Sequence, residues 1–271
     1  GSVSGGCVEG DVITQAREVL KTHKVKILEY GVANAKAWEV GPTCGGRISI
    51  LLSPLTDTDI FKELLEKQSQ QRSCVLALEL ATARTQLMSP GTPTNTNFDH
   101  AIPQCLRNDK AQMTEIDGEK WFLIPFNPPL KLLLIGAVHI AQVLAPMAKL
   151  CGYDLTIIDP RGSFAQRERF EGQTLINTWP DDAMASLNID ARTAIVTLTH
   201  DPKIDDTALQ LALKSEAFYI GCLGSEKTHG ARIERLSKQG FNAETLARIN
   251  GPVGLDIGAT NPAEIAVAIL A

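Results

Sequence analysis

The sequence predicts an α/β chain in which an N-terminal α+β domain precedes a C-terminal domain built on a doubly wound parallel sheet. In the second half, short apolar runs alternate with helical patterns, as they do in parallel α/β sheets. The first half lacks this regular alternation. Between the halves, Phe126-Asn127-Pro128-Pro129 contains a proline pair that continues neither a helix nor a central strand. We therefore expect domains at 1–127 and 128–271, the second of them Rossmann-like.

The elements of the second half follow in strict alternation. Lys131 to Ile135 and Asp154 to Ile158 are the first two predicted strands, and a helix from Ile140 to Cys151 separates them. Further predicted strands are Thr193 to Leu198, Ala217 to Gly221 and Val253 to Ile257, and further helices are Asp205 to Lys214, Ser225 to Gln239 and one from residue 261. Asn261 is the expected N-cap of the last helix, and Glu264 is placed to complete a capping box.

The elements of the first half are less regular. A helix is expected to start at Cys7 or Val8, because apolar residues recur from there at helical spacing. A second helix is expected from Thr56 to Gln68, and Ser89 to Asn97, rich in Pro, Thr and Asn, is predicted to be a surface loop. The predicted strands are Lys26 to Glu29, Arg47 to Leu52, Val75 to Ala81 and Trp121 to Pro125.

The composition is that of an ordinary soluble globular protein. The 271 residues are 44% hydrophobic and 21% charged, with a formal net charge of −5. The negative charge and an aromatic content of 5% argue against a nucleic-acid partner and an anionic membrane surface. No apolar run reaches the ~18 residues that a membrane span requires. Because the chain starts at Gly1 without an initiator methionine or signal peptide, we expect further sequence before it.

The cysteines are dispersed and form no Cys-x-x-Cys pair. They are Cys7, Cys44, Cys74, Cys105, Cys151 and Cys222. A disulfide scaffold is not expected at this length without a secretory signal. The close ligand spacing of structural zinc sites is also absent. We therefore expect reduced thiols in a cytoplasmic protein.

Two of the cysteines lie beside a pair of glycines, in Ser4-Gly5-Gly6-Cys7 and in Thr43-Cys44-Gly45-Gly46. A glycine pair is favoured where the backbone takes a positive φ or where another group approaches it closely. One explanation is a pair of tight turns that carry small buried cysteines. The other is a site that combines backbone amides with thiols. The occurrence of two such loops in one region favours the site.

The loop after the first strand of the second half is similar to a dinucleotide-binding fingerprint, with one defect. In Gly136-Ala137-Val138-His139, amides at a helix N-terminus can face a phosphate. Asp159 ends the next strand, at the position that hydrogen-bonds a ribose hydroxyl. Val138, however, replaces the second glycine and places a branched side chain where a pyrophosphate would approach the backbone. This counts against NAD(P), and a Rossmann-like scaffold without a dinucleotide stays open.

Polar residues also follow the later strands. Thr199-His200-Asp201, the segment Gly221 to Gly224, and Asp256 each lie in such a loop. Because the carboxyl ends of parallel strands line one crevice, we expect these loops to converge there. His139 and His200 could serve as acid, base or ligand, or could simply hold their loops. The glycines that precede the helix at Ser225 form a second possible anion cradle.

Together these motifs resemble the XdhC/CoxI family, accessory proteins of molybdenum hydroxylases such as xanthine dehydrogenase. The matching stretches keep the family's order over nearly the whole chain. They are Ser4 to Gly10, Gly41 to Gly46, Ile135 to His139, Asp159 to Arg161, Thr199 to Asp201, Tyr219 to Ser225, and Gly251 to Ala259 with Pro262 to Ala266. The chain departs from the family at Val138, where the family usually has glycine.

The resemblance implies a chaperone, rather than an enzyme, that binds molybdenum cofactor (molybdopterin). It would hold the cofactor during sulfuration by a cysteine desulfurase and insert it into a molybdenum hydroxylase of the xanthine dehydrogenase type. The candidate cofactor-binding residues are Gly5, Gly6, Cys7, Cys44, Gly45, Gly46, Gly136, His139, Asp159, His200, Gly221, Gly224 and Asp256. Cys7 and Cys44 are the candidate metal contacts, since thiols at such loops suit metal or persulfide chemistry.

Three further expectations accompany this interpretation. A homodimer is expected, because symmetric pairs are the commonest assembly. An NAD(P)-dependent oxidoreductase with His200 as acid or base is the alternative activity. A protein that recruits partners without binding cofactor is the third possibility, because a fold alone does not separate a scaffold from a carrier.

Overall fold

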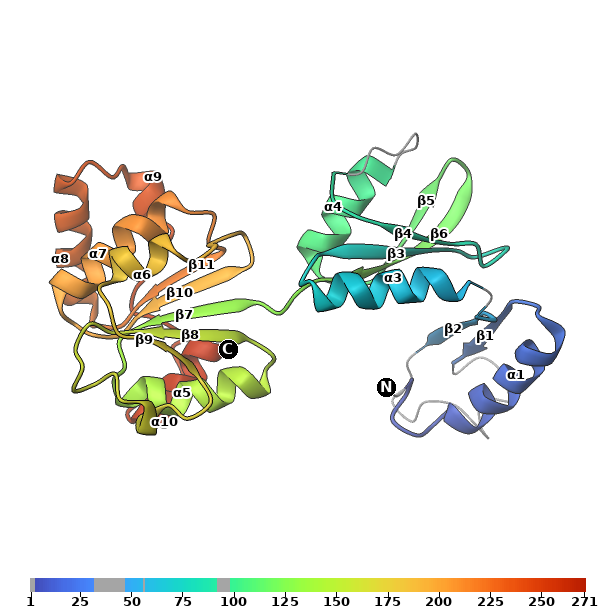
Figure 1. Cartoon of the computed structure of the whole chain (residues 1–271), viewed down its shortest axis with the longest axis horizontal. Helices are drawn as coiled ribbons and strands as arrows, with labels where there is room; N and C mark the ends of the chain where they lie inside the picture. Colours follow the sequence, from blue (N-terminus) through green and yellow to red (C-terminus); the bar gives the residue numbers. More distant parts are fainter. Residues whose placement is uncertain (1–2, 32–46, 56, 92–97) are drawn as a thin grey trace. The chain divides into compact units, whose positions relative to one another are not determined.

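The computed structural model divides into two compact units, Gly1–Pro128 (unit 1) and Pro129–Ala271 (unit 2), which are described separately (Figure 1). It describes residues 3–31, 47–55, 57–91 and 98–271. Within these ranges, no helix combines the length and the apolar character that crossing a membrane would need.

Unit 2 is built on a six-stranded parallel sheet with the order β12-β11-β10-β7-β8-β9. The strands are β7 (Lys131–Ile135), β8 (Asp154–Ile158), β9 (Thr174–Ile176), β10 (Thr193–Thr197), β11 (Tyr219–Cys222) and β12 (Ile249–Asn250). The chain order starts at β7, runs outward through β8 and β9, and then returns to β10 on the other side. This confirms the predicted doubly wound sheet and places its switch point between β7 and β10.

Helices cover both faces of this sheet (Figure 1). They are α5 (His139–Leu150) and α10 (Pro262–Leu270) on one face, and α6 (Pro180–Ala185), α7 (Pro202–Lys214), α8 (Glu226–Lys238) and the short α9 (Ala243–Leu246) on the other. Successive residues of β7 alternate between the two cores, with Leu132 facing α5 and Leu133 facing α7. Because both faces are buried, the strand is apolar without interruption, as the sequence predicted.

The closing strand predicted at Val253 to Ile257 is wrong. The edge strand is β12, and the chain then leaves the sheet. The Val253 amide donates to the Cys222 carbonyl (3.0 Å), whereas the Leu255 amide donates to the Ala268 carbonyl in α10 (2.9 Å). Gly254 has a φ of +87°, and a Cβ there would lie 2.6 Å from the carbonyl carbon of Ala268. The turn at Gly254 therefore attaches this loop to the last helix instead of to the sheet.

Unit 1 contains two antiparallel sheets, in keeping with the predicted α+β class. A two-stranded sheet of β1 (Lys26–Tyr30) and β2 (Ile48–Leu52) contacts α1 (Glu9–Thr22). A four-stranded sheet has the order β4-β3-β6-β5. Its elements are α3 (Thr58–Ser69), β3 (Cys74–Glu79), β4 (Thr85–Met88), α4 (Phe98–Asn108), β5 (Gln112–Ile116) and β6 (Glu119–Phe126). β4, α4 and β5 were not predicted from the sequence.

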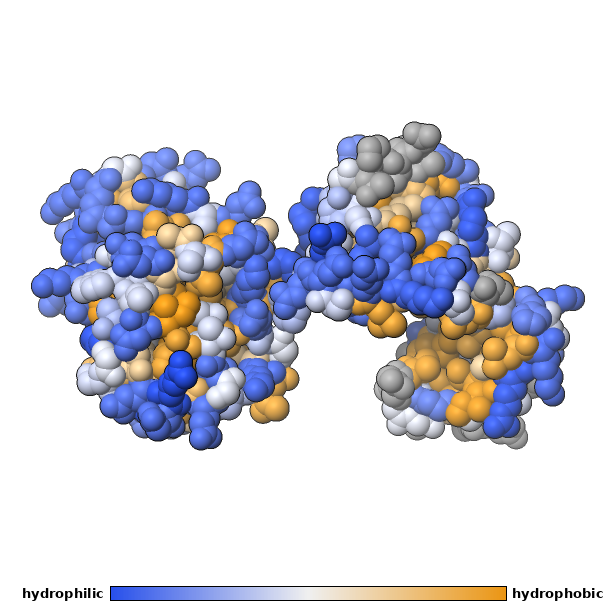
Figure 2. All heavy atoms as spheres, in the orientation of Figure 1, coloured by the Kyte–Doolittle hydropathy of each residue, from blue (hydrophilic) through white to orange (hydrophobic). Residues whose placement is uncertain are grey.

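The core of unit 1 centres on Trp121 of β6, which is 2% exposed. Phe98 of α4 meets its ring edge-to-face, with the centroids 5.1 Å apart. On α3, Leu64 is buried, while the hydrophilic outer face includes an ion pair of Lys62 with Asp59 (Figure 2). The helix predicted over this segment is thus confirmed.

Replacing Gly254 by alanine is expected to lower the free energy of unfolding by roughly 2–4 kcal/mol, because it combines a strained φ with a backbone clash against α10. Gly240→Ala is the matched control, since Gly240 has a φ of +96° and nothing within 4 Å of its Cβ position. The control is expected to cost only ~1 kcal/mol. Urea unfolding measures both, and equal losses would contradict the contact between the loop and α10.

Candidate functional site

The glycines of the first cysteine loop enclose a carboxylate of the protein itself. Glu9 accepts hydrogen bonds from the amides of Ser4 (2.8 Å) and Gly6 (2.9 Å). The Ser4 hydroxyl donates to Glu9 (2.7 Å) and accepts from the Cys7 amide (3.1 Å). Gly5 and Gly6 take φ values of +73° and +119°, which let the loop curl around the carboxylate. Protein acceptors therefore occupy these amides, and the half-buried Cys7 thiol is what the loop offers a ligand.

The second predicted cysteine loop, with Cys44, Gly45 and Gly46, lies outside the described residues. Within the part of the chain that the structure describes, no three or more His, Cys, Asp or Glu side chains are grouped to hold a metal. Of the described thiols, Cys151 is exposed, and Cys74, Cys105 and Cys222 are buried.

The loops after β7 and β10 touch at the switch point of the sheet. Gly136 follows β7 with a φ of +120°, and a Cβ there would lie 2.7 Å from Cγ2 and 3.3 Å from the amide nitrogen of Thr199. Glycine is therefore required at this position by the contact between the two loops as well as by its φ. The fold brings Gly136 and the segment containing His200 to the same edge, as the sequence predicted for parallel strands.

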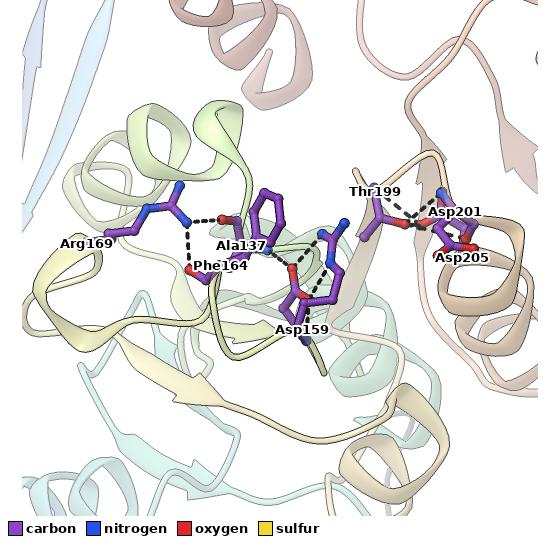
Figure 3. Close-up of polar contacts among 8 residues, drawn as sticks. Ala137, Asp159, Phe164, Arg169, Thr199, Asp201 and Asp205 are labelled. Atoms are coloured by element: carbon purple, nitrogen blue, oxygen red, sulfur yellow. Dashed lines mark hydrogen bonds and ion pairs between the residues drawn. The ribbon is translucent and has the colours of Figure 1, made fainter.

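Asp159, at the end of β8, is fully buried and fixes the loop after β7 (Figure 3). Its Oδ2 accepts from the Ala137 amide and from Nη2 of Arg161, both at 2.8 Å. Its Oδ1 accepts from the amide and Nε of Arg161, both at 2.9 Å. Burial alone would raise the pKa of Asp159, but these hydrogen bonds hold it below its usual value. Four donors use the lone pairs of the carboxylate, so the predicted ribose contact finds no free oxygen.

A second arginine holds the carbonyl of the same residue, Ala137 (Figure 3). Nη1 of Arg169 donates to the carbonyls of Ala137 (3.0 Å) and Phe164 (2.6 Å), and its Nη2 donates to the Gln142 side chain (2.9 Å). The Phe164 ring contacts two guanidinium groups, with Arg161 4.2 Å and Arg169 5.9 Å from its centroid. The sequence analysis gave no role to Phe164 or Arg169, because neither lies in a fingerprint position.

After β10 the chain turns at His200, which has a φ of +61° and an exposed side chain. The Thr199 hydroxyl donates to Asp205 (2.6 Å) and accepts from the Asp201 amide (3.0 Å) (Figure 3). Asp201 caps α7 by accepting from the Lys203 amide (2.9 Å). A left-handed conformation of a non-glycine residue costs on the order of 1 kcal/mol, so these bonds hold His200 at the edge of the sheet.

His139 is exposed at the first position of α5. The N-cap of this helix, Val138, makes no side-chain capping bond. The Val138 side chain packs against the core cluster that α5 and α10 share. The branched side chain at the defective fingerprint position thus contributes to the core, and the start of α5 has no side-chain cap.

The remaining predicted residues differ in their surroundings. Gly221 lies within β11, where a Cβ would lie 2.5 Å from Cγ2 of Val253, so packing requires this glycine. Gly224 has a φ of +144° in the loop before α8. Asp256 is exposed and accepts a hydrogen bond from the Gly258 amide (3.3 Å). The second anion cradle was predicted from Gly221 to Gly224. Of these two glycines, Gly224 lies just before the first turn of α8, whereas Gly221 lies inside the strand.

Comparison with known proteins gives concordant matches for both units. Residues 132–271 match the family model described as the XdhC Rossmann domain, and residues 1–31 match that of the XdhC and CoxI family. The whole chain is 28% identical to the molybdenum cofactor insertion chaperone PaoD of Escherichia coli K12, of which it covers 72%. It is 24% identical to a probable xanthine dehydrogenase subunit of Bacillus subtilis 168, of which it covers 82%.

A solved structure supports the fold. The crystal structure of a xanthine dehydrogenase from Bacillus halodurans matches the whole chain and 80% of its own chain, with a TM-score of 0.72 and 22% sequence identity. At this level of identity the match supports the architecture of the chain.

Replacing Asp159 by asparagine is expected to lower the free energy of unfolding by roughly 2–3 kcal/mol at pH 7, because Arg161 loses its buried charged partner. The folded-state pKa of Asp159 lies below its unfolded value. The advantage of the wild-type protein is therefore complete above about pH 4 and is lost as the pH falls through the lower folded-state value. Urea unfolding between pH 7 and pH 2 measures this difference.

Asp154→Asn, exposed at the start of the same strand, is the control for charge removal and is expected to have little effect. A loss in Asp159→Asn that stays constant down to pH 2 would contradict a role for the ionised carboxylate.

Proposed function

Because the XdhC Rossmann-domain model matches residues 132–271, the chain belongs to the XdhC family, and we propose that it is a chaperone that binds molybdenum cofactor and inserts it into a molybdenum hydroxylase of the xanthine dehydrogenase type. The observation that carries this proposal is the alignment of the whole chain, both units included, with an insertion chaperone. The Bacillus subtilis relative, named for xanthine dehydrogenase, supports the class of partner. The protein is then a carrier rather than a catalyst.

The carboxyl edge of unit 2 is the proposed site for the cofactor, which carries a phosphate at one end of a pterin skeleton. The start of α5 is uncapped, so its first amides are available to a phosphate, with His139 beside them. Asp159 holds the amide and Arg169 the carbonyl of Ala137, just before this helix. A rigid peptide at this position lowers the ordering cost of binding. His200 supplies a second exposed imidazole on the neighbouring loop.

As a separate proposal that concerns unit 1 alone, we take the thiols Cys7 and Cys44 as the groups that contact the metal. Molybdenum bound to a dithiolene is a soft centre that thiolates suit, and the amides around Cys7 are already used by Glu9 and Ser4. The proposal includes sulfuration of the bound cofactor by a cysteine desulfurase. It also includes a homodimer in the cytoplasm, where free thiols stay reduced.

An NAD(P)-dependent oxidoreductase receives no comparable support. The oxygens of Asp159 that would bind a ribose are saturated by Ala137 and Arg161. A protein that recruits partners without cofactor would share this fold, and the binding experiment separates it from a carrier.

The cofactor experiment is anaerobic incubation of the purified chain with molybdenum cofactor, followed by gel filtration and quantification of the pterin that comigrates. Retention near one cofactor per chain is expected. The elution volume also reports whether the chain is a dimer. An absence of pterin in the protein peak, with hydroxylase still captured, would instead establish a partner scaffold. Saturable binding of millimolar NAD(H) that Asp159→Ala weakens would favour the oxidoreductase.

Replacing Cys7 by alanine is expected to reduce cofactor retention severalfold and to leave the melting temperature unchanged, because the thiol is half-buried while the loop is held by Glu9 and Ser4. Cys151→Ala is the matched control, since that thiol is exposed at the end of α5 in unit 2. Equal retention by the two variants would remove Cys7 from the site. Cys44→Ala is measured in the same series.

A further inference from the structure

Three buried polar side-chain atoms near the carboxyl ends of β10 and β11 lack a hydrogen-bond partner within the described part of unit 2. They are Nε and Nη1 of Arg232 and Oδ2 of Asp205. Arg232 and Asp205 are each 2% exposed. Unsatisfied buried polar atoms are costly and rare in native structures. Their concentration in one cluster indicates that a further group completes it.

Arg232, from the second turn of α8, lies at the centre of the cluster. Its Nη2 donates to the carbonyl of Leu223, in the loop between β11 and α8 (3.0 Å). Its charge opposes the effect of burial on the pKa values of Asp205 and Cys222, and it helps burial to lower that of His229. Thr197 and Cys222 are paired neighbours on β10 and β11. The guanidinium therefore lies where α7, α8 and both strand ends meet.

The orientation of the Asp205 carboxylate is set by the loop after β10. Its Oδ1 accepts from the hydroxyl (2.6 Å) and the amide (3.3 Å) of Thr199. These bonds leave Oδ2 without a donor. The same Thr199 packs against Gly136 at the switch point, so the carboxylate is coupled to the proposed cofactor site.

The surrounding groups leave Arg232 as the donor and Asp205 as the acceptor, although burial raises the pKa of Asp205 against the opposing effects of Thr199 and Arg232. The neighbouring Asp206 is already paired with Arg235 through two bonds, at 2.6 and 3.0 Å. Burial raises the pKa of the Cys222 thiol to about 11, so it is neutral. Burial also lowers the pKa of His229. A bare anion would face the Asp205 carboxylate, and a cation would face Arg232.

The missing group must therefore accept hydrogen bonds on one side and donate them on the other. The lactam edge of a heterocycle has this pattern, because a ring carbonyl accepts and the adjacent ring N–H donates. A pterin carries such an edge, extended by an exocyclic amino group that also donates. The free donors of Arg232 and the free Oδ2 of Asp205 supply the complementary donor and acceptor.

We propose that Arg232 and Asp205 form the subsite that recognises the lactam edge of the cofactor's pterin ring. This inference rests on the proposed function. It places the pterin ring of the cofactor at the ends of β10 and β11 and its phosphate at the start of α5. An elongated ligand crosses the switch point of a doubly wound sheet in this manner. Access requires the loop from Leu223 to Ser225, which holds the guanidinium, to move aside.

The test is a fluorescence titration of the full, cofactor-free chain with 6-hydroxymethylpterin and with its 2,4-diamino counterpart, in which an amine replaces the ring carbonyl. The wild-type chain is expected to bind the lactam at least tenfold more tightly. Arg232→Met is expected to bind 6-hydroxymethylpterin roughly tenfold to a hundredfold more weakly, because it loses a hydrogen bond from a charged donor. Lys238→Met, exposed at the end of the same helix, is the control.

Thermal unfolding, measured together with pterin affinity, distinguishes this subsite from a structural ion pair bridged by water. Arg232→Met removes the charge beside Asp205 and the bond to the Leu223 carbonyl, so some fall in melting temperature is expected under either assignment, and the pterin affinity separates them. A fall in melting temperature with unchanged pterin affinity would assign the pair to the fold and overturn the proposal. If Arg232→Met does not fold, Arg232→Lys, which keeps the charge but not the fork of donors, is expected to weaken pterin binding in its place.

Failure of the subsite and failure of the proposed function give different results. Absence of saturable binding, or equal binding of the two rings, overturns the subsite even when the wild-type chain retains molybdenum cofactor. Loss of cofactor retention by the wild-type chain overturns the chaperone proposal even when the ring preference is observed.

Discussion

The buried carboxylate of Asp159 is the constraint on which the carboxyl edge of unit 2 depends (Figure 3). It binds the Ala137 amide on one side and the Arg161 guanidinium on the other. Since Gly136 packs directly against Thr199, a displaced Ala137 peptide would disturb the loops after both β7 and β10. The edge that we assign to the cofactor is therefore preorganised by a group that has no free oxygen for a ligand.

Glu9 has a corresponding role in unit 1. The loop of Gly5 and Gly6 curls around the Glu9 carboxylate and donates a hydrogen bond to it. In the same way, Gly136 packs closely against the loop that contains Thr199. In both units a glycine motif with the pattern of a ligand cradle thus serves a contact within the protein. On our proposal, recognition of the cargo relies on the Cys7 thiol, the exposed imidazoles and the first amides of α5, rather than on the glycine motifs.

The parts of the structure that sequence could predict are those set by local pattern. The buried strands of unit 2 are continuous apolar runs, and their order follows from the alternation with helices. In contrast, β9 has three residues, Thr174–Ile176, too few for a pattern. β5 was missed although Asp117-Gly118, with φ values of +54° and +81°, is a strong hairpin signal. The position of Asp159 was predictable, but its role was not, because saturation by Arg161 arises only in the folded chain.

The carboxyl edge consists of two halves with opposite character. In the half over β7 and β8 the Asp159 carboxylate is saturated with hydrogen bonds, whereas the half over β10 and β11 contains unsatisfied atoms of Arg232 and Asp205. On our proposal, binding satisfies this second half, and part of the binding free energy is used to open the loop above it. The cost of opening keeps the affinity for the cargo below what the contacts alone would give. A carrier that must release its cofactor to a hydroxylase benefits from such a limit, whereas an enzyme with a resident cofactor does not.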